Sequence, residues 1–106
     1  MAHIPRPLPV GVNKSGVPIW DGGDLRRFRE AHGVPVGFVA RAMAITLGAV
    51  STLFENERST VAQRYDRVER YFLAVERMAA QRDEKAATAL AELSARITSQ
   101  TKAAGR

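Results

Sequence analysis

The side chains that most often carry catalysis are scarce in this chain of 106 residues. It has no cysteine and two histidines, His3 and His32, and neither histidine has a serine or carboxylate partner at the spacing of a catalytic motif. There is also no glycine-rich loop of the kind that cradles a nucleotide phosphate. The lack of cysteine excludes a disulfide framework and a Cys/His zinc site. We therefore expect neither an enzyme nor a protein that holds a metal or a cofactor.

Arginine is the residue type in this chain with the widest range of possible binding partners. The chain has sixteen Lys and Arg against eleven Asp and Glu, a net charge of +5, and all but three of the sixteen are arginine. The planar guanidinium suits phosphate groups, base edges and carboxylates. The charges are interspersed, however, with seven basic and five acidic residues in 1–59 and nine and six in 60–106. Such mixing is also typical of a solvated helix surface, so composition alone does not decide the partner.

Residues 1–23 are expected to form an extended arm. They contain four of the five prolines and half of the eight glycines, which disfavours a long helix. The turn-type sequence Asn13–Gly16 between two apolar runs allows a short hairpin. Trp20, the single tryptophan, is expected to pin the arm to the helical body. Arms of this kind can enter a minor groove, with Arg6 and Lys14 as candidate contacts, and a disordered terminus is the alternative for Arg6.

Three short helices are predicted after the arm, and each has a recognisable start signal. Asp21 or Asp24 can cap the first helix, which ends at Gly33. Pro35 is placed to open the second helix and Thr46 to cap the third. The expected ranges are about 24–32, 36–42 and 46–56.

The remainder of the chain favours one long helix or two stacked helices. Beyond Thr60 there is no proline, and no glycine until Gly105, while apolar residues step by three and four. A single helix over 61–99 would be about 58 Å long, which is more than one small globule covers. Its distal half must then pack on a partner chain or fold back at 82–85. The apolar positions are Val61, Tyr65, Val68, Phe72, Val75 and Ala79, followed after a slip in phase by Ala86, Leu90, Leu93 and Ile97.

The segment VGFVARAMAITLGAVSTLFE, residues 36–55, has the pattern that two sharply crossing helices require. Val39 and Val50 would meet across the helix pair, and Ile45 would fill the turn. Ala40 is small at the point where the helices approach most closely. This pattern predicts a helix-turn-helix motif.

With Leu25–Gly33 before it and Glu55–Arg58 after it, the motif resembles the phage repressor and Cro family of DNA-binding regulators. The resemblance covers residues 24 to about 72. It implies an ion pair between Arg29 and Glu55 that braces the first helix against the third.

Three positions depart from the family pattern. The family usually has glycine where this chain has Ala44, so we expect either a positive φ or a different turn there. Val36 replaces a glutamine that often begins the second helix, and Val36 cannot donate a side-chain hydrogen bond. Glu55 comes one residue late, so the third helix is expected to run on or bulge near Phe54.

The docking mode of this family places the third helix in the major groove, which implies DNA contacts on that helix and beside it. Contacts to base edges are implied for Thr46, Leu47, Gly48, Ala49, Ser51 and Thr52. None of these is Arg, Gln or Asn, so selectivity would come more from DNA shape and from the arm than from paired hydrogen bonds to bases. Phosphate contacts are expected from Arg41, Asn56, Arg58 and Arg64, with ordinary solvated surface as the alternative for Arg41 and Arg58.

The sequence thus predicts an all-α fold: an arm over 1–23, a helix-turn-helix domain over 24–72 and a long amphipathic segment over 61–100. The dimer stripe is predicted to consist of Val75, Ala79, Ala86, Leu90, Leu93 and Ile97. The predicted function is a cytoplasmic, nucleoid-associated repressor-like regulator of transcription. Its homodimer would bind palindromic double-stranded DNA, with half-sites one turn or a multiple of a turn apart.

Two alternatives remain open at this point. The helix-turn-helix scaffold could serve as an adaptor of a phage or mobile element that binds a host or partner protein through its uncharged third helix. The long helix could also be the functional part, with the globular portion only capping it. No apolar run reaches the length of a membrane span, so no membrane association is expected.

Overall fold

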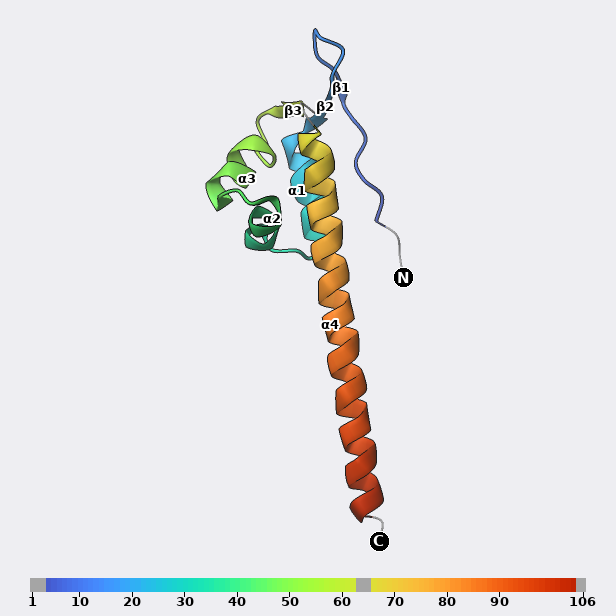
Figure 1. The fold of residues 1–106 in the computed structure, drawn as a ribbon. Helices are drawn as coiled ribbons and strands as arrows, with labels where there is room; N and C mark the ends of the chain where they lie inside the picture. The colour runs from blue at the N-terminus through green and yellow to red at the C-terminus, as the bar shows by residue number, and fades with distance from the viewer. Residues whose placement is uncertain (1–3, 63–65, 105–106) are drawn as a thin grey trace.

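The computed structural model describes residues 4–62 and 66–104, with side chains described as far as residue 98. These residues form four helices and three strands (Figure 1). Residues 4–62, here called the head, pack against the first part of the last helix, and the rest of that helix extends away from the head. The elements are β1 (Gly11–Val12), β2 (Pro18–Asp21), α1 (Gly22–Ala31), α2 (Val36–Met43), α3 (Leu47–Leu53), β3 (Thr60–Ala62) and α4 (Arg67–Ala104).

The prediction of an all-α fold is wrong, because the chain also forms a three-stranded antiparallel sheet. The strand order is β1-β2-β3, so the arm supplies the central strand. Ile19 lies opposite Ala62, and Trp20 lies opposite Val61. Val61 had been assigned to the long helix, but three residues are too few to tell a helical period from an alternating one, and the β-branched Thr60 and Val61 favour a strand. The hairpin that the sequence allowed is present as β1 and β2.

The start signals of the three short helices are confirmed. Asp21 Oδ2 accepts a hydrogen bond of 3.1 Å from the backbone N–H of Asp24, so Asp21 is the cap of α1. Thr46 Oγ1 accepts one of 3.1 Å from the backbone N–H of Ala49 and caps α3. Pro35 precedes α2 in an extended conformation.

Trp20 anchors the arm, as the sequence predicted. Its indole Nε1 donates a 3.0 Å hydrogen bond to the carbonyl oxygen of Pro7. Its ring packs edge-on against Phe72 of α4, with 6.1 Å between ring centroids. The arm then runs along α4 on the side away from α2 and α3 (Figure 1).

The core lies where the head meets α4. Its largest fully buried side chains are Tyr71, Leu25, Val39, Val50, Val68 and Val75. Val75 and Ala79, which were assigned to the dimer stripe, are 0% and 6% exposed because the head covers them. That part of the predicted stripe is wrong, since periodicity identifies an apolar helix face but not what covers it.

α4 is one continuous helix of 38 residues and does not fold back at 82–85. The molecule is therefore elongated, with extents of 75 × 27 × 22 Å and a radius of gyration of 19.3 Å. A compact chain of this length would have a radius of gyration of about 13 Å. Tyr65, predicted to lie on this helix, is outside the described residues.

Candidate nucleic-acid interface

The α2–α3 pair has the geometry of a helix-turn-helix. The chain bends by 96° between the two helices across a turn of three residues, 44–46. Ala44 has φ 57° and ψ 41°, so of the two possibilities left open where the family has glycine, a positive φ and a different turn, the chain adopts the positive φ. The backbone N–H groups of Ala44 and Ile45 donate to Arg41 O and Ala40 O, at 3.1 and 2.9 Å. These two bonds hold the turn and close the end of α2.

The buried side of the pair is packed as the motif requires. Val39 and Val50 are 0% exposed, and Ala40 is 4% exposed. At the end of α3 the carbonyl oxygen of Val50 accepts from both Phe54 N and Glu55 N, at 3.0 and 3.1 Å. This widened last turn is the bulge expected from the late glutamate, and it carries Glu55 into the interior.

Glu55 is the centre of a buried polar network that fixes α3 to the rest of the head. Arg29 Nε of α1 lies 2.5 Å from Glu55 Oε1, and the Glu55 side chain is 4% exposed. The Arg29 guanidinium also donates to the carbonyl oxygen of Val34, at 2.9 Å. The hydroxyl of Tyr71 on α4 lies 2.9 Å from Glu55 Oε1 and 2.9 Å from Leu25 O. The implied Arg29–Glu55 pair is therefore present, and Tyr71 is a third member that the sequence did not indicate.

This network makes a prediction about alkaline stability. Burial, followed by the charge of Glu55, raises the pKa of Tyr71 well above its usual value of about 10. The unfolded chain therefore loses the phenol proton at lower pH than the folded chain does. The stability from neutral Tyr71 is fully present below about pH 10 and declines as the pH rises further. We expect the urea midpoint, followed by Trp20 fluorescence, to fall more steeply above pH 10 in the native chain than in Tyr71→Phe; parallel profiles would contradict this.

The first half of α3 lies on the surface of the head. Leu47 is 54% exposed, and Gly48, Ser51 and Thr52 are exposed as well. Ala49 is half-buried. Thr46 is also exposed. Its hydroxyl oxygen already accepts the capping hydrogen bond from Ala49, so this hydroxyl can still donate a hydrogen bond to another group.

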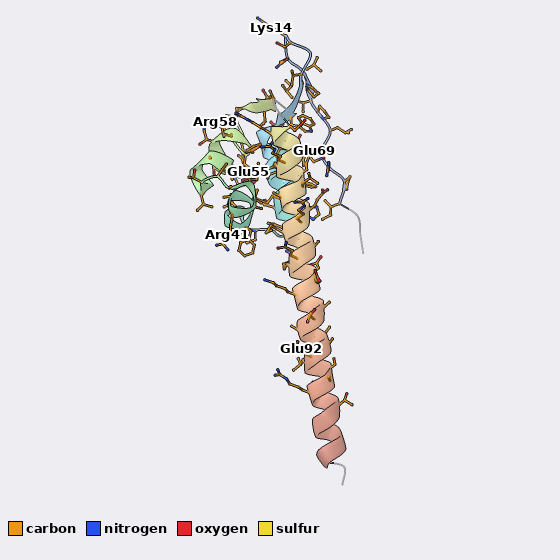
Figure 2. The ribbon with its side chains drawn as sticks, viewed as in Figure 1. Lys14, Arg41, Glu55, Arg58, Glu69 and Glu92 are labelled. Carbon is orange, nitrogen blue, oxygen red and sulfur yellow. The ribbon has the colours of Figure 1, made fainter. Side chains whose placement is uncertain are left out.

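The cations predicted to meet phosphate are placed at both ends of the α2–α3 pair. Figure 2 shows Arg41 beside α2 and Arg58 beyond the end of α3. Both are exposed, and neither forms an ion pair with another described residue. Asn56 Oδ1 accepts from the backbone N–H of Arg58, at 3.0 Å, so Asn56 shapes the loop after α3. Arg64 lies outside the described residues.

The structure adds two cations that sequence analysis missed. Lys85 of α4 borders the same hollow as Arg41 and Phe38, of about 400 Å³. Arg67, at the start of α4, borders a hollow of about 330 Å³ with Thr52. No local signal marks either one, because their place beside the α2–α3 pair depends on β3 delaying the start of α4 and on how α4 packs. Neither forms an ion pair with a described residue.

The chain was compared with protein-family models, curated proteins and solved structures. None of them matches it.

Arg6 has a different role from the predicted contact with DNA. Its guanidinium donates to Glu69 and Glu76 of α4, at 2.9 and 2.6 Å, and lies over the ring of Phe72, 5.2 Å from the centroid. The hydrogen bond to Glu76 is the main reason why the pKa of Arg6 is raised. Arg6 therefore clamps the arm to α4. Lys14, the other predicted arm contact, is exposed at the tip of the hairpin (Figure 2).

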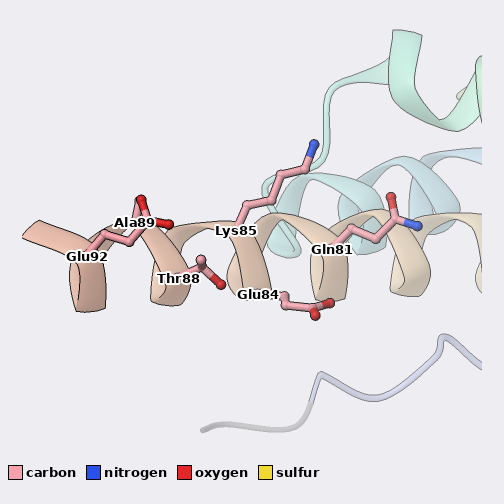
Figure 3. Close-up of a pocket in the computed structure, with 6 residues that line it drawn as sticks. All are labelled: Gln81, Glu84, Lys85, Thr88, Ala89 and Glu92. Carbon is pink, nitrogen blue, oxygen red and sulfur yellow. The ribbon is translucent and has the colours of Figure 1, made fainter.

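The remaining surface of the described residues has no arrangement typical of a catalytic centre. Figure 3 shows a shallow hollow whose six lining residues all belong to α4, with side chains that spread outward rather than converge. Within residues 4–62 and 66–104, no three His, Asp or Glu side chains are grouped so that they could hold a metal ion. No single described helix is long and apolar enough to cross a membrane, and α2 with α3 passes the same test only as a bent pair.

Proposed function

We propose that the chain is a DNA-binding regulator of transcription that inserts the first half of α3 into the major groove, as the resemblance to the phage repressor and Cro family implies. The observation that carries the proposal is the 96° crossing of α2 and α3, which exposes α3 and leaves a group of cations at each end of the α2–α3 pair. Arg41 and Lys85 border a hollow beside α2. Arg58 lies beyond the end of α3 (Figure 2), and Arg67 borders a hollow with the last residues of α3. Two cationic flanks with the α2–α3 pair between them match a groove bordered by two phosphate backbones.

The chemistry of the α3 surface supports weak discrimination between bases. Ser51 and Thr52 can donate or accept a hydrogen bond, so each tolerates several base edges. Leu47 offers an apolar contact that suits a thymine methyl group. Selectivity then rests mainly on DNA shape, and the arm contributes less than the sequence suggested because Arg6 is bound to α4.

The test is a titration of genomic DNA fragments with the double variant R41E/R58E. Losing two phosphate contacts should lower affinity about 60-fold at 0.1 M salt and reduce the slope of log K against log salt by about 2. The matched control is R70E/R77E, which changes net charge equally on a face of α4 that the head leaves exposed. Equal losses in both variants, or no binding by the native chain even at low salt, would contradict the proposal.

A second candidate function is binding of a partner protein through the same surface. It is favoured by the exposed apolar side chains Leu47, Leu53 and Phe38, at 54%, 45% and 45%. Leu47→Asp separates the two candidates when it is compared with R41E/R58E. A protein adaptor would lose its partner in Leu47→Asp and keep it in R41E/R58E, whereas a DNA-binding regulator depends on the two arginines.

A further inference from the structure

The exposed apolar residues of α4 repeat the positions that the head covers. Val68, Phe72, Val75 and Ala79 face the head, and adding 18 to each number gives Ala86, Leu90, Leu93 and Ile97. Eighteen residues are five turns of an α-helix, so both sets lie on the same face of α4. In a heptad count a slip in phase does separate them, because the steps from Val75 to Ala79 and from Ala79 to Asp83 are both four residues, and this extra step keeps both sets on one face of a straight helix. We call the second set the distal stripe.

No described part of the chain covers the distal stripe. Leu90, Leu93 and Ile97 are 65%, 52% and 54% exposed. Between residues 86 and 98 the only charged side chains are Glu92 and Arg96, and neither belongs to the stripe. This is a low charge for a solvated helix and is typical of a helix that packs against another.

A second copy of this chain fits the stripe. When two distal stripes run antiparallel with a shared midpoint between residues 91 and 92, Ala86 lies opposite Ile97 of the partner copy and Leu90 lies opposite its Leu93. A small side chain then faces a large one at each end, and two leucines meet in the middle. The flanking positions Ala87, Ala89 and Ser94 are small, which allows the helices to approach closely, and Arg96, the remaining flanking position, has Ala87 of the partner copy opposite it.

The head excludes the parallel arrangement. Paired helices lie about 8–10 Å apart, and in a parallel pair both heads would have to occupy the space between the two helices at the same level. The head packs on that same face of α4, and the molecule is at least 22 Å across. In an antiparallel pair the two heads lie at opposite ends instead. We propose that the chain forms an antiparallel homodimer through the distal stripes, which deepens the proposed function by giving the two α3 helices a defined separation.

The base of the head carries a hollow at the level of the end of the partner helix. In this register, residue 101 of the partner copy is level with Arg82. Here the head leaves a hollow of about 700 Å³ whose lining includes Ala31, His32, Asp83 and Ala87. His32 Nε2 is buried there and makes no hydrogen bond with any described residue.

The arrangement sets the spacing of the DNA sites. The midpoint of the covered set lies 18 residues, about 27 Å, from the midpoint of the distal stripe. The centre of the dimer coincides with the stripe midpoint of both copies, so the two heads are separated by twice this length, about 54 Å along the helix axes. One turn of DNA is about 34 Å. If the proposed function holds, the half-sites are therefore more than one turn apart, and two turns is the nearest spacing that presents the same face of the DNA.

Single cysteines test the orientation cleanly, because the native chain has none. In the antiparallel pair, position 86 of one copy is about 16 Å along the axis from position 86 of the other, and the same holds for position 97. A disulfide needs Cα atoms within about 7 Å. We expect Ala86→Cys alone and Ile97→Cys alone to stay uncrosslinked on oxidation, and an equimolar mixture to give a disulfide dimer that contains one of each. Efficient self-crosslinking of either single variant would overturn the antiparallel orientation.

The mass in solution tests the interface itself. The native chain should sediment as a dimer, and L90E/L93E as a monomer with the far-UV dichroism and Trp20 emission of a folded head. The matched control A91E/A95E adds the same charges on the opposite face of the same segment and should stay dimeric. A monomeric native chain, or an unchanged mass for L90E/L93E, would overturn the proposal. These readouts involve no DNA, so loss of DNA binding with the crosslinking pattern intact would count against the proposed function alone.

Discussion

Glu55→Gln is expected to destabilise the head by about 3 kcal/mol, because it leaves the Arg29 charge without its counterion in the interior. The Arg29 side chain is 13% exposed and the Glu55 side chain 4% exposed, so water replaces little of the lost interaction. Values of 3–5 kcal/mol are usual for breaking a buried pair, and the residual exposure of Arg29 puts this variant at the lower end. Urea unfolding followed by Trp20 fluorescence measures the loss.

Two further variants separate charge from shape at this site. Glu57→Gln is the matched control, because Glu57 pairs with Arg26 on the surface and its side chain is 63% exposed. Its effect should stay below about 1 kcal/mol. R29M/E55L removes both charges together and should recover most of the stability that Glu55→Gln loses. A Glu55→Gln protein as stable as Glu57→Gln would show that the network contributes little to the fold.

Gly22→Ala is expected to be at least as damaging, for a steric reason. A Cβ atom on Gly22 would lie 2.1 Å from the carbonyl oxygen of Asn56 and 2.8 Å from its carbonyl carbon. Both are backbone atoms of the loop after α3, so relief requires the whole loop to move. Overpacking typically costs about 1–3 kcal/mol, and the backbone obstruction places Gly22→Ala at the upper end, about 3 kcal/mol. The free energy of unfolding in urea is the measurement, and Trp20 is two residues away from the substitution.

Gly48→Ala is the matched control for that variant. No atom lies within 4 Å of a Cβ built on Gly48, which sits inside α3. Alanine has a higher helix propensity than glycine, so this variant should be more stable by up to about 1 kcal/mol. If both alanine variants have the same stability as the native chain, the close approach between α1 and the loop after α3 is not a constraint on the fold.

Local signals were enough to predict the parts of the fold that depend on neighbouring residues. Caps act over three residues, so Thr46 could be identified from its surroundings, and the cap of α1 could be narrowed to Asp21 or Asp24. The family pattern implied the pair of Arg29 with Glu55 and gave a positive φ at Ala44 as one of two possibilities.

The errors in the sequence-based predictions share one physical cause, which is contact between distant segments. Val61 is a strand residue because β3 pairs with the edge of β2, which lies forty residues earlier in the chain. Val75 and Ala79 were assigned to a dimer although the head covers them. For Arg6 the sequence leaves open a DNA contact and a disordered terminus, but Glu69 and Glu76 accept its hydrogen bonds. The sequence shows that a helix face is apolar or that a side chain is charged, but it does not show which segment or molecule will contact that face or side chain.

The clamp between Arg6 and α4 also has a consequence for biosynthesis. Arg6 binds Glu76, seventy residues later, and Leu25 accepts a hydrogen bond from Tyr71. A nascent chain cannot complete this core until α4 has been synthesised to about Ala79, which takes roughly 4–16 s at 5–20 residues per second. During that time Leu25 and Phe28 lack the helix that buries them. The first half of α4 is thus the last piece that closes the head, and stalled or truncated translation products that end before it should be substrates for chaperones and proteases.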